Sequence, residues 1–103
     1  MRSFKHIAKL IRTKRINHPK NYSQSELSQM LGYKNGQFIS NVERGLCNVP
    51  LKMLKKISDV LDIHHDELKQ AILKDNEETL DNFFNKYSTP KAEAVKTNSG
   101  IIV

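Results

Sequence analysis

Several residues able to hydrogen-bond to a ligand face outward from a short helix predicted over residues 36–43. They are two amides, a hydroxyl, a cation and a compact glycine: Gln37, Asn41, Ser40, Arg44 and Gly36. Short amides and a guanidinium suit hydrogen bonds to the base edges and phosphates of a nucleic acid. The alternative is an ordinary solvated helix face, because polar residues alone do not distinguish the two.

The histidines and the cysteine, which could bind a metal or act in catalysis, are not spaced as a metal-binding or catalytic motif. The four histidines are too scattered to predict a ligand cluster: His6, His18, His64 and His65. Cys47 has no spaced partner for zinc, and no glycine-rich phosphate loop or nucleophile motif appears. We therefore expect no enzyme, no metal and no cofactor. A lone Cys47 cannot form an internal disulfide, which fits a reduced, cytoplasmic setting.

A pair of short helices joined by a tight turn positions the polar face. The first is predicted over residues 24–31 and the second over 36–43. Ser23 and Glu26 have the spacing of a capping box, which marks the start of the first helix, and Asn35 is a candidate cap for the second. The inward faces carry apolar residues at helical spacing: Leu27, Met30, Leu31, Ile39 and Val42. A glycine follows each helix, as C′ residues often do: Gly32 and Gly45.

This helix pair resembles the Cro/repressor-type (XRE) family of helix-turn-helix DNA-binding transcriptional regulators. Residues 39–45 read ISNVERG, against a family pattern of I-S-x-I-E-x-G. Further matching residues lie on both sides: Gln24, Leu27, Gly32, Pro50, Leu54, Ile57 and Leu61. The resemblance covers residues 4–73. Two departures are a turn over 32–35 that is one residue longer than the commonest form, and Ser28 where the family usually has alanine.

The resemblance implies that the helix over 36–43 enters the major groove of double-stranded DNA. Gln37 and Asn41 are then the best candidates for base contacts, with two small residues beside them: Gly36 and Ser40. Phe38 either contacts a thymine methyl or the sugar backbone, or packs inward. Four residues are expected to contact phosphates: Gln24, Tyr33, Lys34 and Arg44. The resemblance also implies a structural ion pair between Arg15 and Glu43.

Apolar periodicity predicts further helices, giving an all-α, five-helix repressor-like bundle with an additional C-terminal helix. Three of the bundle helices are expected over residues 4–16, over 50–61 with Pro50 in the first turn, and from about residue 64 to 73. Asp75 and Glu78 repeat a capping signature, which predicts a break at 74–76 and a further helix that ends near residue 87.

The predicted C-terminal helix has an apolar stripe that must be covered. Its residues are Leu80, Phe83, Phe84 and Tyr87. The stripe either folds back on its own bundle or meets the stripe of a second copy, and we favour dimerisation. The expected division is a DNA-binding domain over 1–73, a dimerisation element over 74–87 and a disordered tail over 88–103, whose composition is polar and unpatterned.

Charge is unevenly distributed along the 103 residues, whose formal net charge is +6. Residues 1–22 hold seven Lys and Arg and no acid, whereas residues 63–87 hold three Lys and six Asp and Glu. A basic lobe beside an acidic one favours a polyanion-binding domain whose far side faces away. No stretch approaches the roughly 20 apolar residues of a membrane span.

These patterns together predict a transcriptional regulator that binds double-stranded DNA, with a repressor favoured. We expect a homodimer on a palindromic operator, located in the cytoplasm and associated with the nucleoid when bound. The alternative is a helix-turn-helix adaptor or antitoxin that acts mainly through protein–protein contacts, with the acidic C-terminal segment binding another protein.

Overall fold

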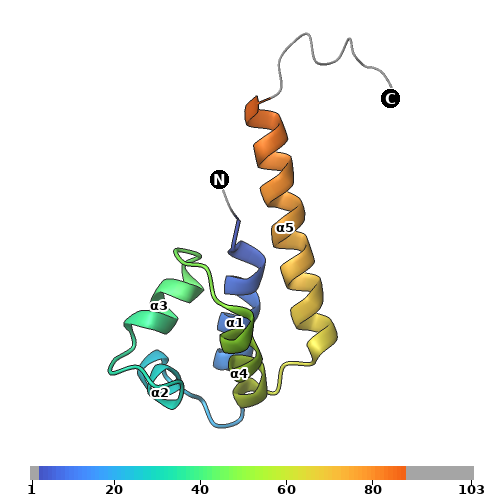
Figure 1. Ribbon diagram of the computed structural model, residues 1–103. Coiled ribbons are helices and arrows are strands. Elements are labelled where there is room, and N and C mark those ends of the chain that lie inside the picture. The colour runs from blue at the N-terminus through green and yellow to red at the C-terminus, as the bar shows by residue number, and fades with distance from the viewer. Residues whose placement is uncertain (1–2, 88–103) are drawn as a thin grey trace, which may run out of the picture.

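The computed structural model describes residues 3–87 and contains only α-helices in that range (Figure 1). The all-α fold class is therefore confirmed. The helices are α1 (Lys5–Asn17), α2 (Gln24–Met30), α3 (Gln37–Glu43), α4 (Leu51–Leu61) and α5 (His65–Tyr87). The tail over 88–103, which the sequence predicts to be disordered, lies outside the described residues, and so does the side chain of Tyr87.

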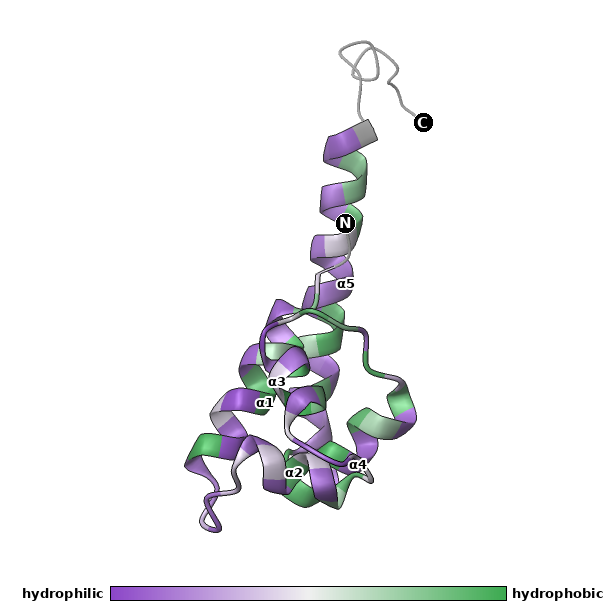
Figure 2. Ribbon diagram, turned by 90° about the vertical axis from the view of Figure 1, so that its left-hand side faces the viewer, coloured by the Kyte–Doolittle hydropathy of each residue, from purple (hydrophilic) through white to green (hydrophobic). Residues whose placement is uncertain are grey.

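Helix α1 lies at the centre of the bundle and contacts α3, α4 and α5, while α2 packs against α3. Helix α5 packs on α1 with its first half and then continues beyond the other helices (Figures 1 and 2). The core is a cluster of buried aliphatic side chains from all five helices and three of their connections: Ile11, Leu27, Leu31, Ile39, Val42, Val49, Leu54, Ile57, Leu61, Ile63 and Leu68.

The capping box predicted at the start of α2 is present. Glu26 N donates to Ser23 Oγ at 3.0 Å, and Ser23 N donates to Glu26 Oε1 at 2.8 Å. The expectation that Met30 faces the core is wrong, because its side chain is 53% exposed. The buried face of α2 instead centres on Leu27, Ser28 and Leu31, and this places Met30 to one side.

Ser28 and Asn35 together cap the start of α3 from outside the helix. Ile39 N donates to the fully buried Ser28 Oγ at 3.2 Å, and Gln37 N donates to Asn35 Oδ1 at 2.9 Å. Both amides belong to the first turn, where a helix has no acceptors of its own. The serine that replaces the usual alanine thus supplies a hydrogen bond to α3.

Gly36 is the N-cap residue of α3 and lies very close to the start of α2. A Cβ atom built on Gly36 would be 3.0 Å from the backbone nitrogen of Ser25 and 3.0 Å from its Oγ. The φ angle of Gly36 is −78°, which any residue adopts, so the requirement for glycine is one of space. The glycine lets the two helices of the pair approach each other.

Each helix of the pair ends at a glycine in the left-handed conformation. The φ angles are +97° for Gly32 and +71° for Gly45. The next residue then donates back into the helix: Tyr33 N to Ser28 O, and Leu46 N to Asn41 O, both at 3.0 Å. These bonds satisfy carbonyls that the helix end leaves open, so both predicted stops are present.

Helix α5 is continuous over 23 residues, so the predicted break at 74–76 and the separate sixth helix are wrong. Asp75 is only 2% exposed, and its carboxylate accepts hydrogen bonds from the backbone amides of His6 at 2.8 Å and Ile7 at 2.9 Å. Both amides lie at the start of α1, whose N-cap residue Phe4 makes no side-chain capping bond. Asp75 is therefore a capping residue, but for α1 rather than for its own helix.

The second half of the capping signature also serves α1. His6 Nε2 lies 2.6 Å from Glu78 Oε2, and Lys5 Nζ lies 3.4 Å from Glu78 Oε1. The hydrogen bond with His6 is the main reason that the pKa of Glu78 is lowered from its ordinary value. The acidic middle of α5 thus complements the positive end of the α1 dipole.

The apolar side chains of the α5 stripe are largely exposed among the described residues. Leu80 is 56% exposed, Phe83 50% and Phe84 62%, so the alternative in which the stripe folds back on the bundle does not occur in the described residues. Asp75 and Thr79 occupy the side of α5 that faces the start of the chain: Asp75 accepts from His6 N in α1, and Thr79 Oγ1 accepts from Ser3 N just before it.

We expect Asp75→Ala to destabilise the fold by about 1–2 kcal/mol, since the amides of His6 and Ile7 lose their acceptor. Urea unfolding measures this change. Asp81→Ala on the exposed part of the same helix is the control and should change the free energy of unfolding by less than about 0.5 kcal/mol. Equal effects of the two substitutions would contradict the capping role of Asp75.

Gly36→Ala should destabilise the fold by about 1–3 kcal/mol through overpacking between α2 and α3. Adding Ser25→Ala should not restore stability, because the clash with the backbone nitrogen of Ser25 remains. Thermal unfolding of the single and double variants tests this. An unchanged midpoint for Gly36→Ala would show that the close approach does not limit this position.

Candidate nucleic-acid interface

The outward face of α3 presents a connected row of polar side chains. Gln37 Nε2 donates to Asn41 Oδ1 at 2.9 Å, and Arg44 Nη2 donates to the same oxygen at 3.1 Å. Gln37 and Arg44 are exposed, Asn41 is half-buried, and the three lie one turn apart along the helix. The row offers amide donors, an amide acceptor and a guanidinium to any partner that reaches α3.

The two small residues predicted beside the row are less exposed than Gln37 and Arg44 but fall in the same range as Asn41. Gly36 and Ser40 are both half-buried. Gly36 already has a packing role against Ser25, as described above. The family resemblance grouped these residues with Gln37 and Asn41, and the structure adds that Gly36 also packs closely against Ser25.

Phe38 packs inward, which is one of the two alternatives left open by the sequence. Its ring stacks on Tyr33, with centroids 4.1 Å apart and planes 10° apart, and its side chain contacts the hydrophobic core. Tyr33 remains 39% exposed. The two rings therefore brace the turn that leads into α3, and the phenol stays accessible from solvent.

Arg15 and Glu43 form a bidentate ion pair that fixes the end of α3. Arg15 Nε donates to Glu43 Oε2 at 2.6 Å, and Nη2 donates to Oε1 at 3.0 Å. The Glu43 side chain is 1% exposed and that of Arg15 is 14% exposed. The hydrogen bond to Glu43 raises the pKa of Arg15, and a third bond from Nη1 reaches Tyr22 O at 3.1 Å. Charge-assisted hydrogen bonds are about twice as strong as neutral ones, and the bidentate geometry fixes the orientation of both side chains.

Gln24, expected at a phosphate, also bonds to Glu43 inside the protein. Its Nε2 donates to Glu43 Oε1 at 3.0 Å, and its side chain is half-buried. Glu43 is thus held by α1 through Arg15 and by the start of α2 through Gln24. No local pattern predicts this second bond, because Gln24 and Glu43 are far apart in the chain.

The remaining residues expected at phosphates lie around α3. Lys34 is exposed in the turn between α2 and α3, where its carbonyl accepts a hydrogen bond from Gln29 Nε2 at 3.4 Å. Arg44 is exposed at the opposite end of α3. Cations therefore flank the helix at both ends, as contacts to two stretches of backbone require.

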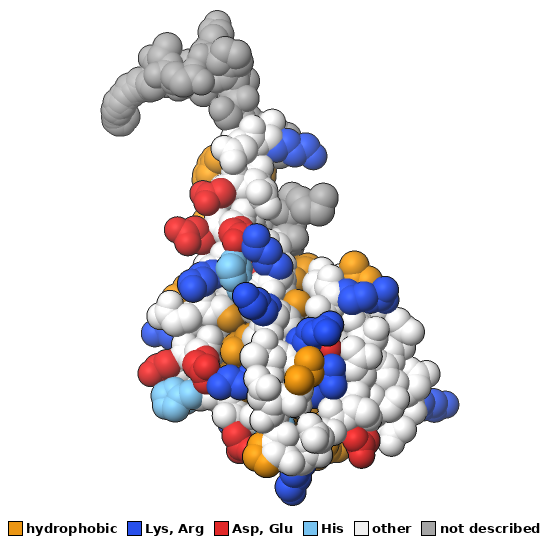
Figure 3. Space-filling model, turned by 180° about the vertical axis from the view of Figure 1, so that it is seen from behind, with side chains coloured by type: hydrophobic (Ala, Val, Ile, Leu, Met, Phe, Trp, Pro, Cys, Tyr) orange, Lys and Arg blue, Asp and Glu red, His pale blue; other side chains and the backbone are white. Residues whose placement is uncertain are grey.

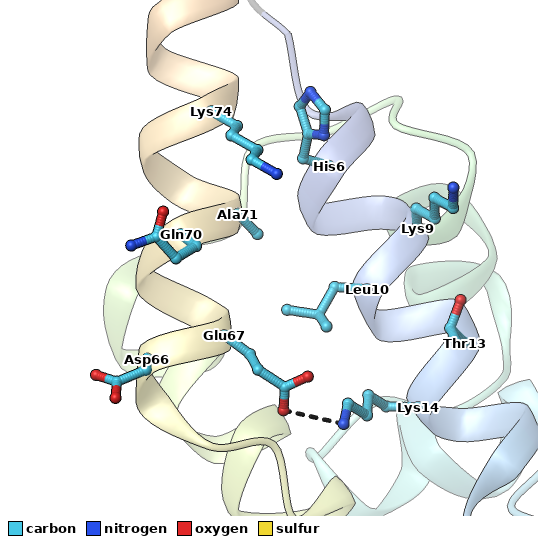
Figure 4. A pocket seen from close by; sticks show the side chains of 10 residues that line it. All are labelled: His6, Lys9, Leu10, Thr13, Lys14, Asp66, Glu67, Gln70, Ala71 and Lys74. Carbon is cyan, nitrogen blue, oxygen red and sulfur yellow. Dashed lines mark ion pairs between the residues drawn. The ribbon is translucent and has the colours of Figure 1, made fainter.

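A second cationic region, which the sequence analysis did not find, lies between α1 and α5. The groove has a volume of about 610 Å³, and its apolar floor is formed by Leu10 and Ala71 (Figure 4). Lys14 Nζ lies 2.9 Å from Glu67 Oε1 across one end, and this contact lowers the pKa of Glu67. Seen from behind, Lys and Arg side chains crowd the middle of this face, while acidic ones follow α5 upwards (Figure 3).

No group of three or more His, Cys, Asp or Glu side chains among residues 3–87 is placed to hold a metal ion. Within the same range, no helix is both long enough and apolar enough to cross a membrane.

The family assignment follows from comparison with known proteins. A family model described as Helix-turn-helix matches residues 11–68, which is more than half of the chain and includes α2, α3 and α4 entirely. Neither the curated proteins nor the solved structures give a match. The matched segment contains the capping box, the ion pair and the exposed row of α3. The chain therefore belongs to the helix-turn-helix family, of the XRE type, and is a DNA-binding regulator.

Proposed function

We propose that this protein is a sequence-specific repressor that inserts α3 into the major groove of a palindromic operator as a homodimer. The observation that carries the proposal is the exposed row from Gln37 through Asn41 to Arg44 on a helix whose opposite face is locked into the core. An α-helix fits the major groove, where base edges present distinct donors and acceptors.

The row supplies the chemistry needed to read bases. Gln37 and Asn41 can each form two hydrogen bonds with the major-groove edge of adenine, at N6 and N7, and Ser40 and Gly36 leave room for close approach of the backbone. In the free protein, Asn41 Oδ1 accepts from both neighbours. Binding would exchange these internal bonds for bonds to base edges. The inward packing of Phe38 leaves it at the border of this surface.

Phosphate contacts would set the orientation on the duplex. Arg44 and Lys34 flank α3, and Tyr33 offers its hydroxyl beside Lys34. Gln24 sits at the start of α2, where it could combine its bond to Glu43 with a phosphate contact through the backbone. The net charge of +6 would draw the protein towards a polyanion.

Dimerisation would come from residues 74–87, whose exposed apolar side chains are otherwise unexplained. Two copies would present two α3 helices to half-sites about 34 Å apart, one turn of DNA. An occupied operator obstructs polymerase, and the protein would then act in the cytoplasm on the nucleoid.

An adaptor or antitoxin is the second candidate, because the same exposed stripe would also suit a different protein partner. A salt titration separates the two functions. Specific DNA binding should weaken with a log–log slope of about −0.9 per phosphate contacted. Sequence-blind binding, or none at low salt, would favour the adaptor.

We expect the double variant Gln37→Ala and Asn41→Ala to lose at least about tenfold of its preference for a selected site over scrambled DNA, since each lost base contact costs about 1–3 kcal/mol. Binding to scrambled DNA should change little. Selection from random duplexes followed by fluorescence anisotropy gives both values.

The matched control for this experiment removes two exposed amides that lie outside α3 and outside residues 74–87, as Asn17→Ala and Gln70→Ala. This control should keep the full preference. If the α3 variant discriminates as well as the control does, α3 is not the element that reads the sequence.

A further inference from the structure

A hollow with mainly apolar walls opens between α1, α4 and the middle of α5. Its volume is about 310 Å³. The apolar residues that line it are Phe4, Ile7, Val49, Leu51, Leu54 and Ile72. Leu51, at the first position of α4, is 72% exposed. An apolar cavity of about 150 Å³ is enough to hold a benzene molecule, so this hollow has room for a phenyl ring.

The exposed stripe of α5 lies on the same side of the molecule as the hollow. Leu73 is 50% exposed, and it continues the stripe of Leu80 and Phe84 at spacings of seven and four residues. Figure 2 shows the hydrophobic edge of upper α5 on the side where the apolar segment leading into α4 also lies. Helix α3 is not on that edge, so a partner docked there leaves α3 uncovered.

The stripe cannot fill the hollow of its own chain. Ile72 and Asn76 line the hollow, and they belong to the same unbroken helix as Phe84. The twelve residues from Ile72 to Phe84 hold the two apart by about 18 Å along the axis. An aromatic side chain from a second copy is free of this constraint.

We propose that two copies pair their α5 helices antiparallel, so that Phe84 of each enters the hollow of the other. This inference rests on the proposed homodimer and specifies its interface. The pair would cross midway between Leu73 and Phe84, near residues 78 and 79. Each Phe84 then lies level with Leu73 of the second copy, beside Ile72 and Asn76. Because the dimer has twofold symmetry, the contact between Phe84 and the hollow occurs twice, once in each copy.

The charges around the hollow and around the α5 stripe support a second copy of the chain as the occupant of the hollow. Helix α4 exposes Lys52, which follows the hollow-lining Leu51, and Lys56 one turn further along; no ion pair is seen for either in the described part of the chain. The C-terminal half of α5 exposes Glu77 and Asp81 beside the stripe. An antiparallel pair brings this acidic segment towards the start of α4, where the helix dipole also favours acids.

Disulfide cross-linking between single-cysteine chains tests the register, in a Cys47→Ser background. Leu73→Cys and Phe84→Cys are made in separate full-length chains of different mass, and both positions are exposed, so folding should be retained. We expect mild oxidation of the mixture to give a covalent Leu73→Cys/Phe84→Cys heterodimer. Phe84→Cys alone should not cross-link, because its two copies lie about 16 Å apart along the axis.

A cross-link within the Phe84→Cys sample at the same rate would overturn the proposal in favour of parallel pairing. A monomer at all concentrations in sedimentation, or a dimer without the mixed cross-link, would also overturn it. Binding-site selection with the same chains reports on DNA recognition separately. A monomer that still prefers a half-site would therefore contradict the interface and the homodimer, but not the reading of DNA by α3.

The hollow itself is tested by Leu51→Asp, a change at an exposed first-turn position that accommodates acids. We expect its dimerisation constant to weaken at least tenfold in sedimentation equilibrium. Met30→Asp, at a 53% exposed apolar position on α2, is the control and should dimerise normally. Equal dimerisation of the two variants would show that the hollow is not occupied.

Discussion

The position of α3 in the bundle depends on the carboxylate of Glu43. It receives two hydrogen bonds from Arg15 of α1 and one from Gln24 of α2, in a position that is almost free of solvent. Helices α2 and α3 have seven residues each, which is too short to be stable alone in water. The ion pair therefore fixes the end of α3 against the central helix, while apolar contacts fix its middle.

Hydrogen bonds between helices complete what each short helix cannot supply for itself. Ser28 of α2 caps α3, and Asp75 of α5 caps α1. In both cases a buried polar side chain is satisfied by backbone amides that would otherwise have no acceptor. Each bond also sets the position of one helix relative to another, so the caps contribute to the arrangement of the bundle as well as to helix stability.

The sequence predicted well the features that depend on neighbours in the chain. The capping box of Ser23 and Glu26 and the stops at Gly32 and Gly45 need only local spacing, and all are present. The break predicted at Asp75 was wrong for a physical reason. A capping pattern identifies a residue that accepts amide hydrogen bonds, but it does not say which helix donates them.

Other parts of the site required the fold. The bond from Gln24 to Glu43, the close contact of Gly36 with Ser25 and the groove between α1 and α5 all join segments that are distant in sequence. The ion pair of Arg15 and Glu43 was expected only through the family resemblance, because nothing in the spacing of two residues 28 apart indicates contact. The structure supplies its geometry and burial.

A double-mutant cycle on Arg15→Met and Glu43→Leu, followed by urea unfolding, tests most directly whether this pair holds α3 in place. Each single variant leaves one charge buried without its partner, so each should lose about 3–5 kcal/mol of stability. The double variant removes both charges and should be clearly more stable than the sum of the single losses predicts. Strictly additive losses would contradict the account, since they would show that the two residues stabilise the fold independently.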